Sequence, residues 1–500
     1  MKQKYILAID HGTTSTRAII FDHNCKIIGV SQKEGGVSYP APGWVEQDAI
    51  SIWLDTEAVI ADVLNQTALD PSQIAAIGLS NQRETSVLWD RKTGLPIYKA
   101  IVWQSRQTSE ICDRWKEQGL EDMIREKTGL RIDPYFSASK IAWMLENVPG
   151  AREKAENGEL LFGTMDSWLV WKLTGGERHI TDVSNASRTL LCNIENVAWD
   201  DDLLKALNIP RSILPTIVPT SANYGNTAPY AFFGAEVPIC SMVGDQQAAL
   251  FGQLCLEKGM AKNTYGTGGF LLMNTGEDIV RSNNGLLSTI AWQLGEENPV
   301  TYALEGSIFV SGSVMKWLRD KLKMFDKVSQ TQEMAKRAGS TGGVYIVPGF
   351  VGLGAPYWDD KAKASIVGLT LGTTNDQVVR AAIESMAYQA RDVLDSMEKD
   401  AGIPISKLKV DGGAAANDFL LQFQSDLCQV PVERFKVNEL TALGAAFLAG
   451  LAIGYWNLDE LKIEVETEFE PRRGAEEMER RYANWQHAVQ ACREFKPDML

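Results

Sequence analysis

Histidine and cysteine are scarce in this chain, and neither is clustered. Only four of the 500 residues are histidine and seven are cysteine, and no two cysteines form a CxxC pair. This argues against a zinc site built from His and Cys. An odd number of isolated cysteines is typical of reduced thiols in the cytosol, so we expect a cytoplasmic protein without disulfides.

The chain also lacks a long hydrophobic run and an excess of positive charge. No uninterrupted apolar stretch approaches the roughly 20 residues that span a bilayer. Asp10 follows the first apolar segment too soon for a signal peptide. The formal net charge is -15, which repels nucleic acids and anionic membranes, so we expect neither as a partner. ATP is repelled too, and any nucleotide site must be organised locally.

The familiar phosphate-binding and hydrolase motifs are missing as well. A Walker A loop requires a Gly-Lys pair, and the chain contains none. Gly352 and Gly354 begin a possible GxGxxG pattern, but the third glycine is absent. There is no GxSxG elbow and no protein-kinase HRD and DFG set. These absences disfavour the common nucleotide-binding and hydrolase classes.

What the chain does contain is a regular alternation of expected strands and helices. Its length suggests two large domains, and the alternation predicts an α/β fold. We expect strands at residues 5–10, 17–22, 75–80, 237–244, 262–264, 270–273 and 408–411. We expect helices at residues 245–253, 378–394, 417–427 and 441–451, and a solvated helix in the charged tail at 476–492.

One device occurs twice, about half a chain apart: a strand, a Gly/Thr-rich tip and a second strand. The tips lie at residues 11–16 and 265–269. Tight turns of this composition present amides and hydroxyls that can bind phosphate oxygens. Either tip alone could be an ordinary polar turn. Two copies, together with Asp411-Gly412-Gly413 after a strand, favour a nucleotide cleft between two related halves, residues 1–253 and 254–500.

Several segments together resemble the FGGY carbohydrate kinases. They are residues 8–17, 243–247, 265–270, 352–358 and 411–414, and the resemblance extends from residue 5 to about 455. It implies a two-domain actin/Hsp70-like (ribonuclease H-like) fold with an ATP cleft between the domains, and ATP and Mg²⁺ as cofactors. The segments 79–84, 101–106, 133–136 and 441–445 resemble the subgroup that acts on glycerol.

The resemblance identifies Asp245 as the general base. A hydroxyl that attacks the γ-phosphorus must lose its proton, and a carboxylate can accept it. Without the resemblance, Asp245 could equally be a helix N-cap, Arg83-Glu84 an exposed charged pair, and the aromatic residues part of the core. The substrate-binding residues that the resemblance implies are Arg83, Glu84, Trp103, Tyr135, Asp245, Gln246, Phe270 and Thr13.

The same resemblance implies a nucleotide site and a metal site. Asp10 would position Mg²⁺, through water, because this ion keeps much of its hydration shell. Lys316 stands where the family usually has Gln. The implied nucleotide-binding residues are Thr13, Thr14, Ser15, Arg17, Thr267, Gly312, Lys316, Gly413 and Asn417.

We therefore expect a kinase that transfers the γ-phosphoryl group of ATP to glycerol, giving sn-glycerol 3-phosphate, and that assembles as a homodimer or homotetramer. One alternative is another FGGY kinase acting on a pentulose or pentitol. A second is an actin/Hsp70-like ATPase, since a shared fold does not settle function. A sugar-sensing module without catalysis is a third, which the intact Asp10 and Asp245 disfavour.

Two departures from the family pattern lead to further expectations. His11 stands where Gln is usual, beside the first tip, so nucleotide affinity could depend on pH. The segment 224–236 contains no Arg, Lys or His. It therefore lacks both the Gly-x-Arg site for fructose 1,6-bisphosphate and the phosphorylated histidine of some relatives, and we expect neither control.

Overall fold

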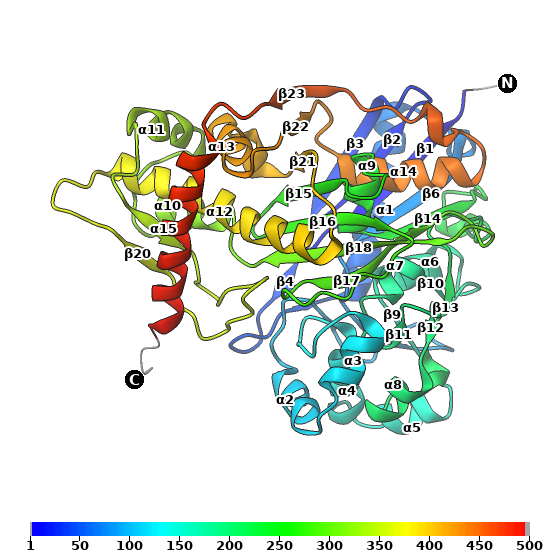
Figure 1. The fold of residues 1–500 in the computed structure, drawn as a ribbon. Coiled ribbons are helices and arrows are strands. Elements are labelled where there is room, and N and C mark those ends of the chain that lie inside the picture. Colours follow the sequence, from blue (N-terminus) through cyan, green and yellow to red (C-terminus); the bar gives the residue numbers. More distant parts are fainter. Residues whose placement is uncertain (1–2, 496–500) are drawn as a thin grey trace.

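The computed structural model describes residues 3–495, and two large mixed sheets organise it (Figure 1). The first sheet has five strands in the order β14-β6-β1-β2-β3. β1 pairs antiparallel with β2 and parallel with β6. The strands are β1 (Tyr5–His11), β2 (Ser15–Phe21), β3 (Ile27–Glu34), β6 (Ile74–Asn81) and β14 (Ile239–Gly244).

β1 is apolar on both sides because a helix covers each face of this sheet. Leu7 and Ile9 join one hydrophobic core with α1 (Ala49–Thr67). Ile6 and Ala8 point the other way, into a core with α14 (Leu440–Ala452). Alternation along a strand sends successive side chains to opposite faces. The first polar positions therefore come only at the carboxyl end of β1.

The second sheet has seven strands in the order β17-β18-β16-β15-β21-β22-β23. Its inner five strands, from β18 to β22, repeat the antiparallel and parallel pairing pattern of the first sheet from β3 to β14. The strands are β15 (Ala261–Tyr265), β16 (Gly269–Gly276), β17 (Leu287–Gln293), β18 (Val300–Ile308), β21 (Leu408–Asp411), β22 (Val432–Phe435) and β23 (Val465–Phe469).

Two helices cross between the sheets: α9 (Asp245–Gly252), which follows β14, and α14, which follows β22. Their backbones touch at glycines. A Cβ atom on Gly252 would lie 2.0 Å from the Leu440 carbonyl oxygen, and one on Gly444 would lie 1.9 Å from that of Ala248. No other residue permits so close an approach. One hydrophobic core contains both helices and side chains of both sheets, so it joins the two halves of the chain.

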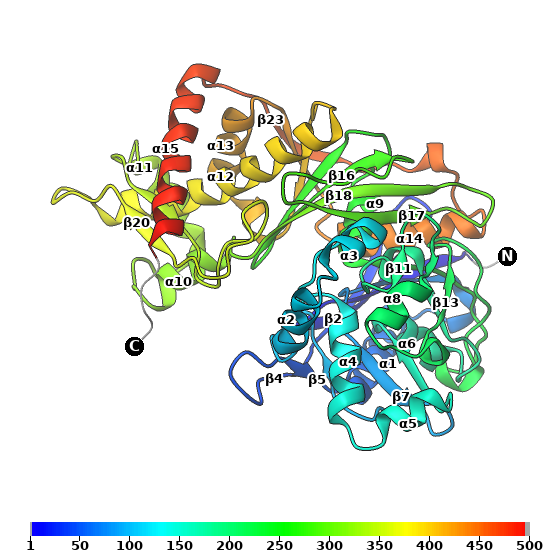
Figure 2. The same ribbon diagram turned by 60° about the horizontal axis from the view of Figure 1, so that its bottom comes forward.

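Between β6 and β14 the chain forms an additional lobe, seen below the first sheet in Figure 1 and in front of it in Figure 2. It has its own hydrophobic core, which includes Tyr135 and Phe136. Its helices are α2 (Ser109–Glu117), α3 (Glu121–Thr128), α4 (Ser137–Asn147), α5 (Ala151–Glu156), α6 (Met165–Leu173), α7 (Val183–Ala186) and α8 (Asp201–Ala206). Its strands are β7 (Val87–Asp90), β8 (Ala100–Ile101), β9 (Leu160–Gly163), β10 (Ile180–Asp182), β11 (Cys192–Asn193), β12 (Ala198–Trp199) and β13 (Thr216–Val218).

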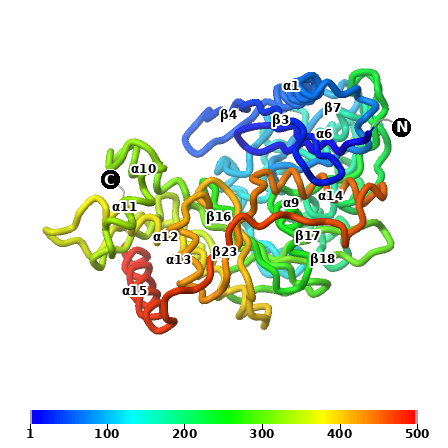
Figure 3. Tube along the Cα trace, turned by 90° about the horizontal axis from the view of Figure 1, so that it is seen from above, coloured from blue at the N-terminus to red at the C-terminus, as the bar shows by residue number. Residues whose placement is uncertain are grey.

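The other helices of the second half gather on the face of its sheet that is opposite to α9 and α14 (Figures 1 and 3). They are α10 (Ser313–Asp320), α11 (Thr331–Arg337), α12 (Asn375–Ala401), α13 (Asp418–Cys428) and α15 (Ala475–Glu494). The short strands β4 (Val37–Ser38) and β5 (Glu46–Gln47) pair near the first sheet, and β19 (Tyr345–Val347) and β20 (Ser365–Val367) pair in the second half.

The expected strands and helices are all present, with two differences. α12 is longer than predicted at both ends: a capping box at Thr374 and Gln377 starts it earlier, and it continues to Ala401, where Gly402 ends it in the left-handed conformation. The helix in the charged tail is not simply solvated: Trp485 is 1% exposed, and its indole donates to Asp392 on α12 at 2.9 Å. In residues 3–495, no helix is long and apolar enough to cross a membrane. The outer limits predicted for the two domains, residues 1 and 500, lie outside these residues.

Candidate active site

Asp10 and Asp245 lie at the carboxyl ends of strands in the first sheet. Ser80 Oγ on the neighbouring strand donates to Asp10 Oδ1 at 3.1 Å. Burial raises the pKa of Asp10 to about 7, Arg17 opposes the rise, and the negative charge of Asp245 adds to it. Two carboxylates thus share a poorly solvated space at this edge, where a cation would relieve their repulsion.

Asp245 is the first residue of α9, and Gly244 is the N-cap. The alternative that Asp245 is itself the N-cap is therefore wrong. Its Oδ1 accepts the amide proton of Gln246 at 2.8 Å and lies 3.4 Å from Arg83 Nε. Burial raises the pKa of Asp245, while Arg83, Lys262 and a hydrogen bond from the Gln246 side chain lower it.

Arg83 and Glu84 are buried, at 3% and 1% exposure, so the reading as an exposed pair is wrong. Arg83 Nη2 donates to Glu305 Oε1 at 3.0 Å, and Nη1 donates to the other oxygen. Arg188 Nε donates to Glu84 Oε1 at 2.6 Å, and its Nη2 to Glu305 Oε1 at 3.0 Å. Two arginines and two glutamates form this ion-pair quartet. Glu84 has a φ of 61°, a strained backbone of the kind found at functional sites.

The ion pairs set the protonation states within this quartet. Burial alone would raise the pKa of Glu305, but the attraction of Arg188 and Arg83 outweighs it and lowers the pKa to about 2. Burial raises the pKa of Glu84, and the two arginines oppose the rise. The guanidinium groups remain charged at any physiological pH.

Three aromatic rings border the quartet. Trp103 lies 5.5 Å from Tyr135 and 6.1 Å from Phe270, measured between ring centroids. The Tyr135 hydroxyl accepts from Arg83 Nη2 at 3.2 Å. Trp103 Nε1 donates to Thr13 Oγ1 at 2.9 Å, which ties the aromatic wall to the first hairpin tip. Apolar faces and hydroxyl-binding groups together suit a small polyol.

The first tip is a tight turn closed by a hydrogen bond from Gly12 N to Ser15 O of 2.9 Å. Thr14 is exposed, and Thr13 and Ser15 are half-buried. Arg17 is already paired, because its Nη1 lies 2.8 Å from Glu439 Oε2. It is thus fixed at the start of α14 and is not a free surface arginine.

The second tip is linked to the start of α10. Gly312 N donates to Gly266 O at 2.9 Å, and the Thr267 carbonyl accepts from Ser311 N at 2.9 Å. Thr267 is exposed. Lys316 is also exposed, one turn into α10, and no hydrogen bond or ion pair joins it to the other predicted residues in the described chain.

The turn after β21 provides a third surface. Gly412 has a φ of 88°, and a Cβ there would lie 2.5 Å from the Tyr265 carbonyl oxygen, so the turn packs directly on the second tip. Gly413 faces open space. Asn417 is the N-cap of α13. The glycines leave backbone open to a flat ligand.

Models of a known family match both halves of the chain. The N-terminal domain of the FGGY family of carbohydrate kinases matches residues 5–252, and its C-terminal domain matches residues 261–453. The chain belongs to the FGGY family of carbohydrate kinases. The boundary near residue 253 stays a prediction.

Among curated FGGY kinases, a glycerol kinase of Geobacillus sp. (strain WCH70) is 57% identical over 99% of this chain and 100% of its own length. A glycerol kinase of Bacillus mycoides (strain KBAB4) is 58% identical with the same coverage. The crystal structure of Plasmodium falciparum glycerol kinase with ADP superimposes with a TM-score of 0.93, at 36% identity and 98% coverage of each chain. Gluconate kinase from Lactobacillus acidophilus, at 22% identity and a TM-score of 0.88, shares the fold.

His11 corrects one expectation drawn from the FGGY pattern. Its ring is 2% exposed and hydrogen bonds with Thr16 Oγ1 at 2.8 Å and Gln82 Nε2 at 3.1 Å. Burial lowers the pKa of His11 to about 4. The imidazole is therefore neutral from pH 5.5 to 8 and provides no basis for the expected pH dependence of nucleotide affinity.

Sequence reasoning missed Arg188, Glu305 and Lys262. All three are fully buried charged residues in contact with the predicted site. Glu305 did leave a signal, since it is a lone acid within the apolar strand β18, and buried charges are normally paired. Its partner could not be read from the sequence, because Arg83 is 222 positions away.

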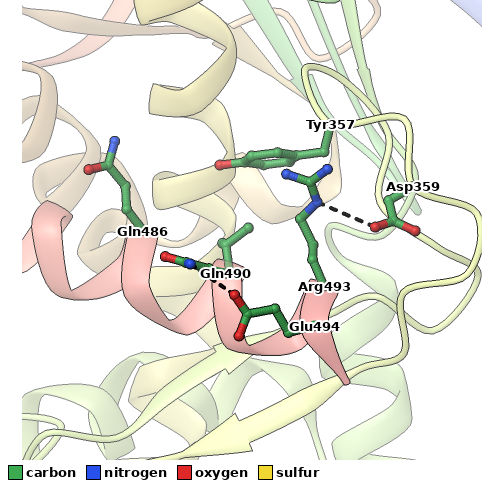
Figure 4. A pocket seen from close by; sticks show the side chains of 7 residues that line it. Tyr357, Asp359, Gln486, Gln490, Arg493 and Glu494 are labelled. Carbon is green, nitrogen blue, oxygen red and sulfur yellow. Dashed lines mark hydrogen bonds and ion pairs between the residues drawn. The ribbon is translucent and has the colours of Figure 1, made fainter. Parts of the chain in front are cut away.

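A surface pocket of about 550 Å³ lies elsewhere, against α15 (Figure 4). The side chain of Arg493 lies across this pocket, with its Nε 3.3 Å from Asp359 Oδ2. None of its lining residues is among the predicted site residues. They are Tyr357, Asp359, Gln486, Val489, Gln490, Arg493 and Glu494.

Proposed function

We propose that this chain transfers the γ-phosphoryl group of ATP to a terminal hydroxyl of glycerol, giving sn-glycerol 3-phosphate. The observation that carries this proposal is the polar cluster of Arg83, Glu84, Tyr135 and Asp245, which lies beside the two Gly/Thr-rich tips that would bind phosphate. The glycerol kinases that match 99% of the chain support the choice of substrate.

In the proposed reaction, Asp245 acts as the general base. Its carboxylate accepts the hydroxyl proton while the hydroxyl oxygen bonds to the γ-phosphorus. The bond from that phosphorus to the bridging oxygen breaks, and ADP leaves. Arg83 next to Asp245 favours the ionised carboxylate at neutral pH.

The quartet would hold glycerol in one orientation. Arg83 donates to substrate hydroxyls and Glu84 accepts from them, while Tyr135 and Gln246 add polar contacts. Trp103 and Phe270 cover the carbon chain of glycerol, and Thr13 links the Trp103 indole to the first tip. Correct orientation accounts for a large part of catalysis in transfers of this type.

For the nucleotide, we propose that the first tip and the second tip contact the phosphates, with Arg17 balancing their charge. The glycine turn and the start of α10 would hold the base and ribose, with Lys316 the least supported member because it is exposed and unconnected. The proposed residues are Thr13, Thr14, Ser15, Arg17, Thr267, Gly312, Lys316, Gly413 and Asn417.

Mg²⁺ fits this site as a partly hydrated ion. Within residues 3–495, no group of three or more His, Cys, Asp or Glu residues could hold a metal ion, so the protein would hold it through Asp10 and water. The elevated pKa of Asp10 indicates a carboxylate that a cation would stabilise. When bound, Mg²⁺ neutralises charge on the phosphates.

Two alternatives keep the same fold. A pentulose or pentitol kinase would use the same nucleotide site, and only the residues of the polyol clamp, Arg83-Glu84, Trp103 and Tyr135, argue against it. An actin/Hsp70-like ATPase would not require a base adjoining a polyol clamp. We also propose a cytoplasmic homodimer or homotetramer, and light scattering on the purified protein measures that assembly.

The test is ADP release from Mg-ATP with glycerol, dihydroxyacetone, xylulose, ribulose, xylitol or gluconate. We expect strong turnover with glycerol and a loss of about 10²- to 10⁴-fold in kcat for Asp245→Asn, since a general base contributes that much. The matched control is Asp278→Asn, which removes an exposed carboxylate that pairs with Lys258. Turnover with a five-carbon substrate instead, or turnover indifferent to all alcohols, would contradict the proposal.

A further inference from the structure

Lys262 on β15 is a buried cation to which the reaction above gives no role. Its side chain is 0% exposed. Nζ donates to Gln246 Oε1 at 2.5 Å, to Thr264 Oγ1 at 2.8 Å and to the Phe270 carbonyl at 3.3 Å. Burial of an ammonium group is costly unless it is well paired, so a stable fold alone does not explain why a lysine stands here.

The contact with Gln246 fixes the orientation of that side chain. The two ends of an amide are otherwise nearly equivalent in shape. An ammonium group can only donate hydrogen bonds, so Oε1 must face Lys262 and the NH₂ group must face away. Gln246 is also bonded to the proposed base, because its backbone N–H donates to Asp245 Oδ1 at 2.8 Å, and its side chain lowers the pKa of that carboxyl group.

We propose that Lys262 is a positioning residue: it holds the Gln246 amide in a single orientation and places a positive charge beside Asp245. This inference rests on the proposed function, because it concerns the base and a substrate contact of that reaction. The other charged groups that face Asp245 are Arg83 and Asp10. Those that face Lys262, besides Asp245 and Arg83, are Asp411 and Glu305.

The neighbouring strand offers a matched control. Lys409 on β21 is paired in register with Lys262. It donates to the backbone carbonyls of Gln253 at 2.8 Å and Leu254 at 3.0 Å, and it touches none of the site residues. Lys409→Met therefore removes a comparable lysine without disturbing Gln246 or Asp245.

The experiment compares Lys262→Met, Lys262→Gln and Lys409→Met in the full chain. For Lys262→Met we expect kcat/KM for glycerol to fall by about 10²-fold, the usual effect of misplacing a reacting group, with the Kd for ADP unchanged. Loss of the cation raises the pKa of Asp245, so the acid limb of the kcat/KM profile moves to higher pH. Lys262→Gln keeps a donor for Gln246 but no charge. It should recover part of kcat/KM and keep the displaced limb.

The inference is overturned if Lys262→Met behaves like Lys409→Met. It is also overturned if glycerol turnover, ADP affinity and Tm all fall together while the acid limb stays in place, because that pattern describes a purely structural lysine. Should Lys262→Met not fold, an unshifted limb in Lys262→Gln decides against the inference. Wild-type protein without glycerol-dependent ADP release would refute the proposed function, and this inference with it, before any variant is compared.

Discussion

At the scale of single residues, the ion-pair quartet of Arg83, Glu84, Arg188 and Glu305 dominates the electrostatics of the site. All four side chains are at most 3% exposed, so water screens them little. A buried pair is expensive to form, but removing one partner is worse because it leaves an unpaired charge. Each member therefore constrains the other three.

Glu305→Gln should destabilise the protein by about 3–5 kcal/mol, because Arg83 and Arg188 then lose their shared anion. The KM for glycerol should rise, since Glu305 orients Arg83. The pKa of Glu305 lies near 2, below its usual 4.5, so its contribution is complete above about pH 4.5 and lost as the pH falls toward 2. Calorimetric Tm values of wild type and variant should converge over that range.

Glu464→Gln is the matched control, because this glutamate pairs with Lys436 at the surface and is 69% exposed. Surface pairs contribute about 0–1 kcal/mol. A Tm difference between wild type and Glu305→Gln that is equally small at pH 7 would mean that the quartet is not a coupled unit.

At the scale of elements, each half of the chain presents a hairpin tip, and the second tip packs against the glycine turn after β21. Gly412 and Gly413 adjoin in sequence but differ in role. Gly412 has a φ of 88° and backbone atoms of Tyr265 within 3 Å of a Cβ position, whereas Gly413 has open space. The first position is required for packing, and the second leaves room for a ligand.

Gly413→Ala should therefore fold normally and bind nucleotide poorly. We expect a free energy of unfolding within about 0.5 kcal/mol of the wild-type value and a KM for ATP raised about tenfold, equivalent to about 1.4 kcal/mol. The KM for glycerol should not change. Gly474→Ala, also in open space, should leave both constants alone. A normal KM for ATP in Gly413→Ala would remove this turn from the nucleotide site.

At the scale of the whole molecule, the proposed site draws on both halves of the chain. Asp10, Arg83 and Asp245 come from the first, while Thr267 and Phe270 come from the second. The halves share one core through the glycine crossing of α9 and α14. A narrow crossing of this kind can act as a hinge, and closure would exclude water from ATP and the base.

We expect the radius of gyration in X-ray scattering to decrease when glycerol and a non-hydrolysable ATP analogue bind together, and less with either alone. Asp245→Asn should still close, because the amide preserves most contacts. An unchanged radius in the ternary complex would show that the two halves do not move on binding. That result would not bear on the role of Asp245 as general base, which the kinetics of Asp245→Asn test.

Much of the fold could be predicted because its signals are local. Two Gly/Thr tips between apolar strands identify the hairpins, and Asp245 follows an apolar strand directly. The boundaries of α12 and the packing of α15 could not be predicted in the same way. The capping box and the contact of Trp485 with Asp392 depend on interactions that hydrophobic periodicity does not report.

The sequence by itself determined the alternating α/β pattern, the duplicated tips, and the family motifs with the residue types that a phosphoryl transfer requires. Only the tertiary structure decided which charges are buried and which are paired. It brought Glu305 to Arg83 across 222 positions, and it placed Lys262 against Gln246. It also buried His11, so that its pKa is about 4. The reason is physical: strand and turn formation depend on neighbours in the chain, whereas desolvation and ion pairing depend on neighbours in space.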